Sequence, residues 1–400
     1  MRARLLTVAL IGAVAFVQPA AASETVIKIS VEKEAPEKKT KPGKAPFTGK
    51  RPAVDLAILL DTSNSMDGLI SQAKAQLWKI VNRFADAKKD GKTPVLRVAL
   101  FEYGNTSLPA SEGYLRQVVP LTDDLDKISE QLFALKTNGG DEYCGQVIDQ
   151  ALSRLDWSKE PGSYQSIFIA GNEPFTQGSV DYRKSCQRAI ELGVVVNTIH
   201  CGSYSNGVSG QWAHGAELAE GEYLNIDQDR AVERIATPHD KIIIKLSSEL
   251  NSTYLWYGAK AEHYRSNQAE QDRNATRLSS SIAASRAATK ASSNYSNFGR
   301  CVVDNFIADE KTLDKIAEKD LPEVLRDLSP EQRVAHVKQL AAQRKDLQQQ
   351  IKQLNRKRDL FAAQARKKNA KADAEATLGD AFAAAIDQQI KLSGFETNDR

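Results

Sequence analysis

The segment Val54–Leu60 (VDLAILL), followed directly by Asp61-Thr62-Ser63-Asn64-Ser65, decides the fold that we expect of this chain. A mostly apolar run with β-branched residues is typical of a strand covered on both faces. Apolar side chains then recur at helical spacing over residues 69–84. This strand–loop–helix order predicts the opening unit of an α/β domain.

Strand-like and helix-like segments continue to alternate up to about residue 236. The pattern predicts further strands at 95–103, 114–119, 166–170, 194–200 and 222–226. It predicts helices at 124–136, 142–155, 181–192 and 212–219, and another that begins within 230–235. Such alternation favours an open, doubly wound, mostly parallel sheet, in which ligand sites lie beyond the carboxyl ends of the strands.

Composition narrows the class of protein by exclusion. The 400 residues are 41% hydrophobic and carry a net charge of +3, so collagen-like, wholly disordered and disulfide-dense classes are excluded. The near-neutral balance also argues against a dedicated nucleic-acid binder. No Gly-rich phosphate loop and no convincing catalytic constellation is present, so we expect no enzyme activity.

The first 52 residues carry the features of an export signal and a linker. Residues 1–22 have a basic start, an apolar run too short to span a bilayer, and a small-residue ending, which is typical of a cleaved signal peptide. Residues 23–52 are rich in Lys, Pro and Gly and read as a disordered linker. We therefore expect a periplasmic or secreted protein.

The Asp61–Ser65 loop has two interpretations. A carboxylate and two hydroxyls at alternate positions, Asp61, Ser63 and Ser65, place three oxygens on one side of a tight loop, and Mg²⁺ or Mn²⁺ prefers such oxygen ligands. Alternatively, Asp and Ser in this position cap the following helix. The position after a buried strand favours the metal site.

The strand Val54–Leu60, the Asp61–Ser65 loop and the order of strands and helices after it resemble a von Willebrand factor type A (VWA) domain. The resemblance covers residues 53–240. The resemblance implies a Mg²⁺ or Mn²⁺ site with Asp61, Ser63 and Ser65 as ligands, completed by a carboxylate of a protein ligand. The chain departs from the family pattern at two motifs. Asp141 follows Gly139-Gly140 where the family has Thr, and Asn172 or Glu173 stands where the family has Asp. The loops also resemble those of secreted bacterial VWA proteins with helical tails.

Three cysteines, Cys144, Cys186 and Cys201, are expected near the same upper face of the sheet, where an exported protein forms disulfides. A disulfide among them is one interpretation, with its connectivity open. A thiol nucleophile paired with His200 or His214 is a weaker one.

The C-terminal 160 residues are expected to be mostly helical. Residues 241–328 form a connecting region, in which 241–250 fits either a strand or a helix. Residues 329–400 form a tail, whose heptad positions Leu340, Leu347, Leu354 and Phe361 predict a coiled coil and a route to a homo-oligomer. An Ala-rich segment within 372–388 is expected to fold back on this helix as a hairpin.

Residues 329–371 are strongly basic, with 12 Lys and Arg against 3 Asp and Glu. One interpretation is a helix face that is simply solvated. The other is a docking surface for an acidic partner, which could be anionic lipid, a cell-wall polymer or a protein.

The expected function is therefore metal-dependent binding of a protein ligand in the cell envelope, without catalysis and without nucleic acid. Two alternatives stay open. One is a structural envelope protein that acts through its coiled coil and has a vestigial metal site. The other is a thiol-dependent hydrolase.

Overall fold

The computed structural model describes residues 51–369 and 377–396, all within one compact unit, Lys44–Arg400. The predicted signal peptide and nearly all of the predicted linker lie outside the described residues.

A six-stranded sheet forms the first part of the described chain. The strand order is β3-β2-β1-β4-β5-β6, and every neighbouring pair is parallel except β2 and β3. The strands are β1 Ala53–Asp61, β2 Val95–Tyr103, β3 Arg116–Thr122, β4 Tyr164–Gly171, β5 Val195–Cys201 and β6 Tyr223–Ile226. This order confirms the predicted doubly wound, mostly parallel sheet.

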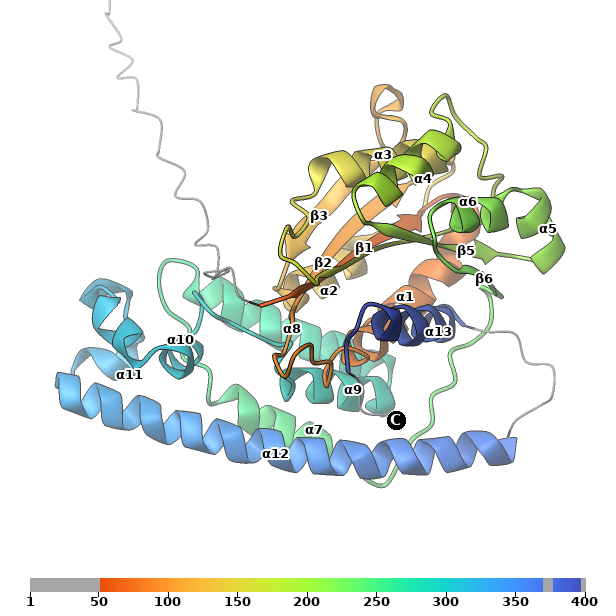
Figure 1. Ribbon diagram of the computed structural model, residues 1–400. Coiled ribbons are helices and arrows are strands. Elements are labelled where there is room, and N and C mark those ends of the chain that lie inside the picture. The colour runs from red at the N-terminus through yellow and green to blue at the C-terminus, as the bar shows by residue number, and fades with distance from the viewer. Residues whose placement is uncertain (1–50, 370–376, 397–400) are drawn as a thin grey trace, which may run out of the picture. The chain divides into compact units, whose positions relative to one another are not determined.

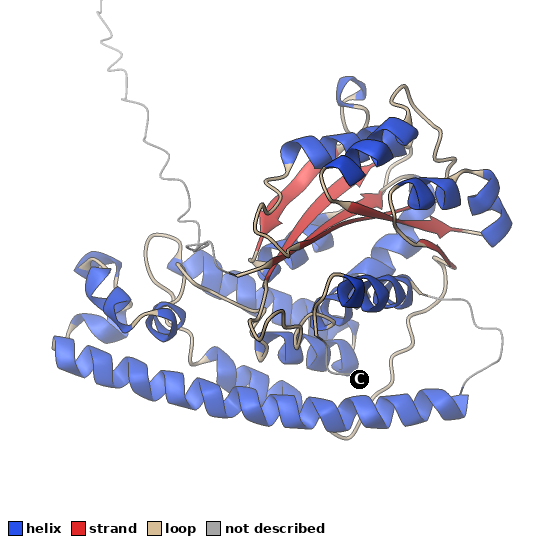
Figure 2. Cartoon of the chain, in the orientation of Figure 1, coloured by secondary structure: helices blue, strands red, loops and turns tan. Residues whose placement is uncertain are grey.

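Helices cover both faces of the sheet (Figure 2), and the side chains of β1 alternate between the two. Leu56, Ile58 and Leu60 enter one core, while Ala57 and Leu59 enter the other. The first core is covered by α1 Asp67–Asn82, α2 Leu125–Ala134 and α13 Leu378–Leu392; the second by α3 Cys144–Arg154, α4 Tyr182–Glu191 and α6 Trp212–Leu218. Burial on both faces explains why β1 is a mostly apolar segment without polar alternation.

The connection after β6 corrects one prediction. No helix begins at Arg230; the next helix is α7, Asp240–Asn251, so the segment 241–250 is helical. Pro238 disfavours helical backbone at the residue before it. The helix start is fixed by Asp240, whose carboxylate accepts hydrogen bonds from the Thr237 backbone N–H at 3.1 Å and the Thr237 hydroxyl at 2.7 Å.

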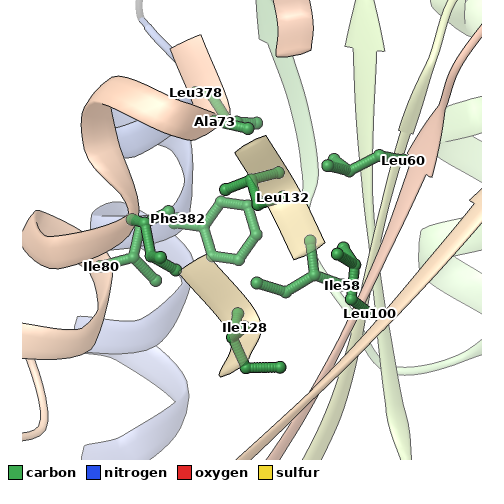
Figure 3. Close-up of a pocket in the computed structure, with 10 residues that line it drawn as sticks. Ile58, Leu60, Ala73, Ile80, Leu100, Ile128, Leu132, Leu378 and Phe382 are labelled. Carbon is green, nitrogen blue, oxygen red and sulfur yellow. The ribbon is translucent and has the colours of Figure 1, made fainter. Parts of the chain in front are cut away.

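The C-terminal helix α13 also corrects a prediction, because it packs on α1 and beside β5 and β6 instead of folding back as a hairpin (Figure 1). Phe382 stacks on Phe168 of β4 with ring centroids 4.1 Å apart. Leu378 and Phe382 meet side chains from β1, β2, α1 and α2 around a void of only about 10 Å³ (Figure 3). A void of this size holds about one water, so this region is packed core and offers no ligand pocket.

A third core lies among the C-terminal helices. It joins α7 to α9 Ser280–Lys290, α10 Val302–Ala308 and the long helix α12 Pro330–Asn369. The remaining elements are α5 Tyr204–Ser209, α8 Ala261–Leu278, α11 Glu323–Arg326 and the short helices η1 Asn64–Met66, η2 Ala110–Glu112, η3 Glu310–Lys315 and η4 Glu318–Asp320.

The predicted heptad seam of α12 is largely occupied within the chain. Leu347 is buried, Leu340 and Leu354 are partly buried in the third core, and Phe361 is 42% exposed. The seam packs on α7, α9 and α10 rather than on a second long helix in the described part of the chain. The regular spacing therefore reflects a mixed helical core, and it supplies no evidence for a coiled-coil oligomer.

A buried ionic cluster connects these helices to α2. Arg286 of α9 is 1% exposed and donates to Asp126 of α2 at 2.7 Å and to Asp272 of α8 at 2.5 Å. Lys290 donates to the same Asp272 at 2.8 Å, and the Arg286 guanidinium lies 4.7 Å from the ring centroid of Trp78. Every charge in the cluster thus has a partner, which buried charges require.

Candidate metal site at the carboxyl edge of the sheet

The predicted loop lies where the strand order of the sheet reverses. From β1 the chain runs outward through β2 and β3 on one side and through β4, β5 and β6 on the other. Asp61 ends β1 and Gly171 ends the neighbouring β4, so the loops after these two strands diverge from one point. Open α/β sheets bind their ligands in the crevice at this point.

Backbone hydrogen bonds fold the loop so that its oxygens converge. Asp61 Oδ1 accepts from the Ser63 backbone N–H at 2.7 Å, and the Met66 N–H donates to the Ser63 carbonyl at 3.0 Å. The Ser63 and Ser65 hydroxyl oxygens are 3.1 Å apart. The structure therefore brings together the three oxygen-bearing residues that the sequence selected.

The helix-capping interpretation of this loop finds no support in the structure. The residue that precedes α1 is Met66, and no side chain caps that helix. Ser63 precedes the short helix η1 and likewise makes no side-chain cap. The side-chain oxygens of the loop therefore do not cap a helix and are available to bind a ligand.

Glu142 is the functional candidate that sequence reasoning missed. It is 3% exposed, and its carboxyl group lies beside that of Asp61: a Cβ on Gly104 would come within 2.8 Å of both Asp61 Oδ1 and Glu142 Cγ. The Gln177 side chain accepts from the Glu142 backbone N–H at 2.9 Å, which fixes the position of the residue. The only sequence signal was its place one residue after Asp141.

Asp141 itself points elsewhere. It is exposed, and its carboxylate accepts a hydrogen bond from the Tyr143 hydroxyl at 3.1 Å. Thr137, on the other side of the glycine pair, donates to Asp67 at 2.5 Å. The structure therefore places Glu142, rather than Asp141, next to Asp61.

The loop after β4 approaches through Asn172 and through the backbone of Glu173. The Asn172 side-chain amide donates to the Ser65 hydroxyl at 3.2 Å. The Glu173 backbone N–H donates to Glu142 Oε2 at 3.3 Å. The carboxylate of Glu173, in contrast, accepts a hydrogen bond from the Gln177 side chain at 3.4 Å. Glu173 thus contacts the cluster through its backbone, and Asn172 through its side chain.

The two buried carboxyl groups of Asp61 and Glu142 would be stabilised by a positive charge between them. Asp61 is 0% exposed, and its Oδ2 has no hydrogen-bond partner. Burial, and next the adjacent Glu142 carboxyl, raise the pKa of Asp61 well above its usual value. Burial also raises the pKa of Glu142. Two neighbouring buried carboxyls without a cation are a costly arrangement.

These residues fit a hard divalent cation. Asp61 offers an unused carboxylate oxygen, Ser63 and Ser65 offer paired hydroxyls, and the buried Asn172 Oδ1 also lacks a hydrogen-bond partner. Mg²⁺ accepts such mixed oxygen donors and keeps waters in its remaining positions. Across the described residues no group of three or more His, Cys, Asp and Glu is arranged for a metal, so hydroxyls and an amide must share the coordination here.

Cys144, Cys186 and Cys201 form no disulfide with one another, contrary to one interpretation of the sequence. All four are free and buried. Cys144 and Cys186 belong to the core on the α3 and α4 face, whereas Cys201 belongs to the opposite core beneath α1, so the sheet separates them. Burial raises the pKa of Cys186 to about 12, and those of Cys144 and Cys201 well above their usual value.

The fold and the site together define a doubly wound α/β domain with a cluster of oxygen ligands at its strand-order reversal. Residues 55–246 match the family model of the von Willebrand factor type A domain, and the chain therefore contains a domain of that family. This agrees with the resemblance read from the sequence.

Solved structures similar to part of the chain include a VWA domain, the bacterial protein BatB and a pilus adhesin. The SpRpn10 VWA domain is 18% identical, with a TM-score of 0.34, and the match covers 44% of this chain and 88% of that one. BatB from Bacteroides thetaiotaomicron is 16% identical, with a TM-score of 0.33 and coverage of 44% and 91%. The pilus adhesin SpaC from Lactobacillus rhamnosus GG is 14% identical, with a TM-score of 0.32 and coverage of 44% and 28%. No curated protein sequence matches the chain.

None of the helices in the described parts of the chain combines the length and apolar character needed to span a bilayer.

Proposed function

We propose that this chain is an exported, non-enzymatic protein whose VWA domain binds a protein ligand through Mg²⁺ or Mn²⁺. Asp61, Ser63 and Ser65 would hold the cation, with Glu142 beside them. The observation that carries the proposal is the buried Asp61 Oδ2, which has no hydrogen-bond partner although it lies next to a second carboxyl group.

The exposure of the cluster supports binding of a ligand from outside. Asp61 and Ser63 are buried, while Ser65 is exposed and Asn172 is half-buried, so the cluster opens toward solvent on one side. When bound, the cation would supply a positive centre with exchangeable water positions, which a carboxylate of the ligand protein replaces.

The alternative that the loop is vestigial and the protein is purely structural has less support. A loop that only capped a helix would use its oxygens as helix caps. Instead no side chain of the loop caps α1, and the Asp61 and Glu142 carboxyl groups lie buried side by side.

The thiol-hydrolase alternative is disfavoured by the thiols themselves. The thiolate is the nucleophilic form, and burial keeps Cys144, Cys186 and Cys201 protonated at neutral pH. His200 and Cys201, as adjacent strand residues, point to opposite faces.

Ligand capture with matched variants tests the proposal. Immobilised full-length chain is exposed to envelope extract in Mg²⁺ or in EDTA, and a captured protein is then purified and its affinity measured. We expect saturable binding in Mg²⁺ that is lost in EDTA and in Asp61→Asn, but kept in Asp141→Asn. Equal affinity of a purified ligand with and without the cation would refute metal-dependent binding.

A further inference from the structure

The outward face of α12 carries a row of basic side chains. Lys345 and Lys352 are seven residues apart, Arg356 follows four residues later, and all three are exposed. Spacings of seven and four place them along one side of a helix, over about 16 Å at 1.5 Å per residue.

These three charges are not used inside the molecule. Other basic residues of α12 are paired: Arg344 with Asp304, Arg358 with Asp240, and Arg333 with Glu318. In contrast, no hydrogen bond or ion pair within the described residues holds Lys345, Lys352 or Arg356.

Two acidic residues lie in the same stretch. Asp359 is paired with Arg358 at 3.1 Å and accepts from Asn355 at 3.0 Å. Asp346 accepts from the neutral Gln350 at 2.8 Å and keeps its charge, which offsets one of the three positive charges. The basic row therefore keeps a net positive charge toward solvent.

One large apolar side chain, Leu360, follows the basic row. It is 67% exposed, whereas the inner side of α12 is packed against α7 in the third core (Figure 1). Leu360 lies four residues after Arg356 and so continues the same row. Phe361 has heptad spacing to Leu354 and therefore lies on the seam side of the helix, away from this row.

We propose that this face of α12, formed by Lys345, Lys352, Arg356 and Leu360, docks on the surface of an anionic lipid bilayer. The basic row meets the lipid headgroups, and Leu360 enters the boundary between headgroups and acyl chains, as apolar side chains do in helices that lie in a membrane interface. This surface is distinct from the metal site, so its test is independent of the proposed function.

Vesicle co-sedimentation of the full-length chain tests the electrostatic part. We expect binding to vesicles of equal parts phosphatidylcholine and phosphatidylglycerol, weakening as salt increases, and no binding to phosphatidylcholine alone. The triple variant Lys345→Gln, Lys352→Gln, Arg356→Gln should lose roughly a hundredfold in affinity.

A matched triple variant removes three exposed lysines elsewhere, Lys184→Gln, Lys260→Gln and Lys319→Gln, and should retain binding. Equal losses in the two triple variants, or absence of binding to the anionic vesicles, would overturn the proposal. So would binding of the chain to soluble heparin without binding to anionic vesicles, because that result assigns the row to a soluble polyanion. Circular dichroism and urea midpoints confirm that each variant is folded.

The variant Leu360→Gln tests the apolar part. It should lower vesicle affinity several-fold and make the remaining binding more sensitive to salt. The control Val324→Gln replaces a residue that is 51% exposed on α11. If the two variants bind alike, Leu360 does not enter the bilayer and that part of the proposal is wrong.

Discussion

Phe382 of the last helix stacks on Phe168 of the central strand β4, with ring centroids 4.1 Å apart and an angle of 17° between the planes. More than 200 residues separate the two in sequence. The contact makes the C-terminal segment part of the core under α1, and it means that the sheet-bearing region does not end where its last strand ends.

The first prediction concerns this contact. Phe382 is 0% exposed, so Phe382→Ala should lower the free energy of unfolding by about 3–5 kcal/mol, through lost burial and the cavity left behind. Leu392→Ala on the same helix should change it by less than about 0.5 kcal/mol, because Leu392 is 80% exposed. Urea unfolding of both variants measures the difference, and equal effects would contradict a core role for α13.

A second prediction concerns the buried ionic cluster. Arg286→Met should destabilise the chain by about 3–5 kcal/mol, since it leaves the buried Asp126 carboxylate without its cation. Arg273→Met removes the pair between Arg273 and Glu270 on the surface, where the Arg273 side chain is 56% exposed, and should leave stability nearly unchanged. If urea midpoints shift equally in the two variants, the cluster does not stabilise the junction of α2, α8 and α9.

The third prediction concerns pH and the start of α13. Burial by itself would raise the pKa of Asp380, but the Lys79 ammonium at 2.7 Å and hydrogen bonds from Thr377 outweigh it and lower the pKa to about 2. Because the folded pKa is below the unfolded value of 3.8, the stabilisation is complete above about pH 4 and is lost as the pH falls toward 2.

The stability difference between the wild type and Asp380→Asn should therefore shrink as the pH falls through this window. The side chain is half exposed, so the pH-dependent part should stay below about 1 kcal/mol. A difference that is independent of pH between 7 and 3 would argue against the Lys79 pair.

The fourth prediction concerns the metal-free site. In EDTA, Asp61→Asn should raise the free energy of unfolding by about 1 kcal/mol or more, because it removes a buried carboxylate that faces Glu142 without a cation. Asp141→Asn, at an exposed position, should be neutral to within about 0.5 kcal/mol. Destabilisation by Asp61→Asn in EDTA would mean that the carboxylate is satisfied without a metal.

Local patterns in the sequence predicted the sheet well, because most of its strands are rich in apolar residues and most of the helices between them have their own apolar periodicity. Two failures, at α13 and at the heptad of α12, involve contacts between distant segments. Neither the Ala-rich composition around α13 nor the heptad of α12 records which surface each helix covers. Phe382 and Leu347 each meet partners that only the folded chain brings near.

In the candidate site, too, the residues of one loop were predicted and the residue from a distant loop was not. Asp61, Ser63 and Ser65 lie in one short loop, so their spacing predicted their convergence. Glu142 reaches Asp61 from another loop, and its orientation depends on Gln177 and on the room that Gly104 leaves. The motif position alone selected Asp141, whose side chain points to Tyr143 instead.

Isothermal titration calorimetry of the full-length chain with Mg²⁺ and Mn²⁺ is the direct test of the metal site. We expect saturable heat for the wild type and for Asp141→Asn, and none for Asp61→Asn, which folds but lacks the carboxylate ligand. Absence of heat in the wild type, or the same binding in Asp61→Asn as in the wild type, would contradict a metal site at the end of β1.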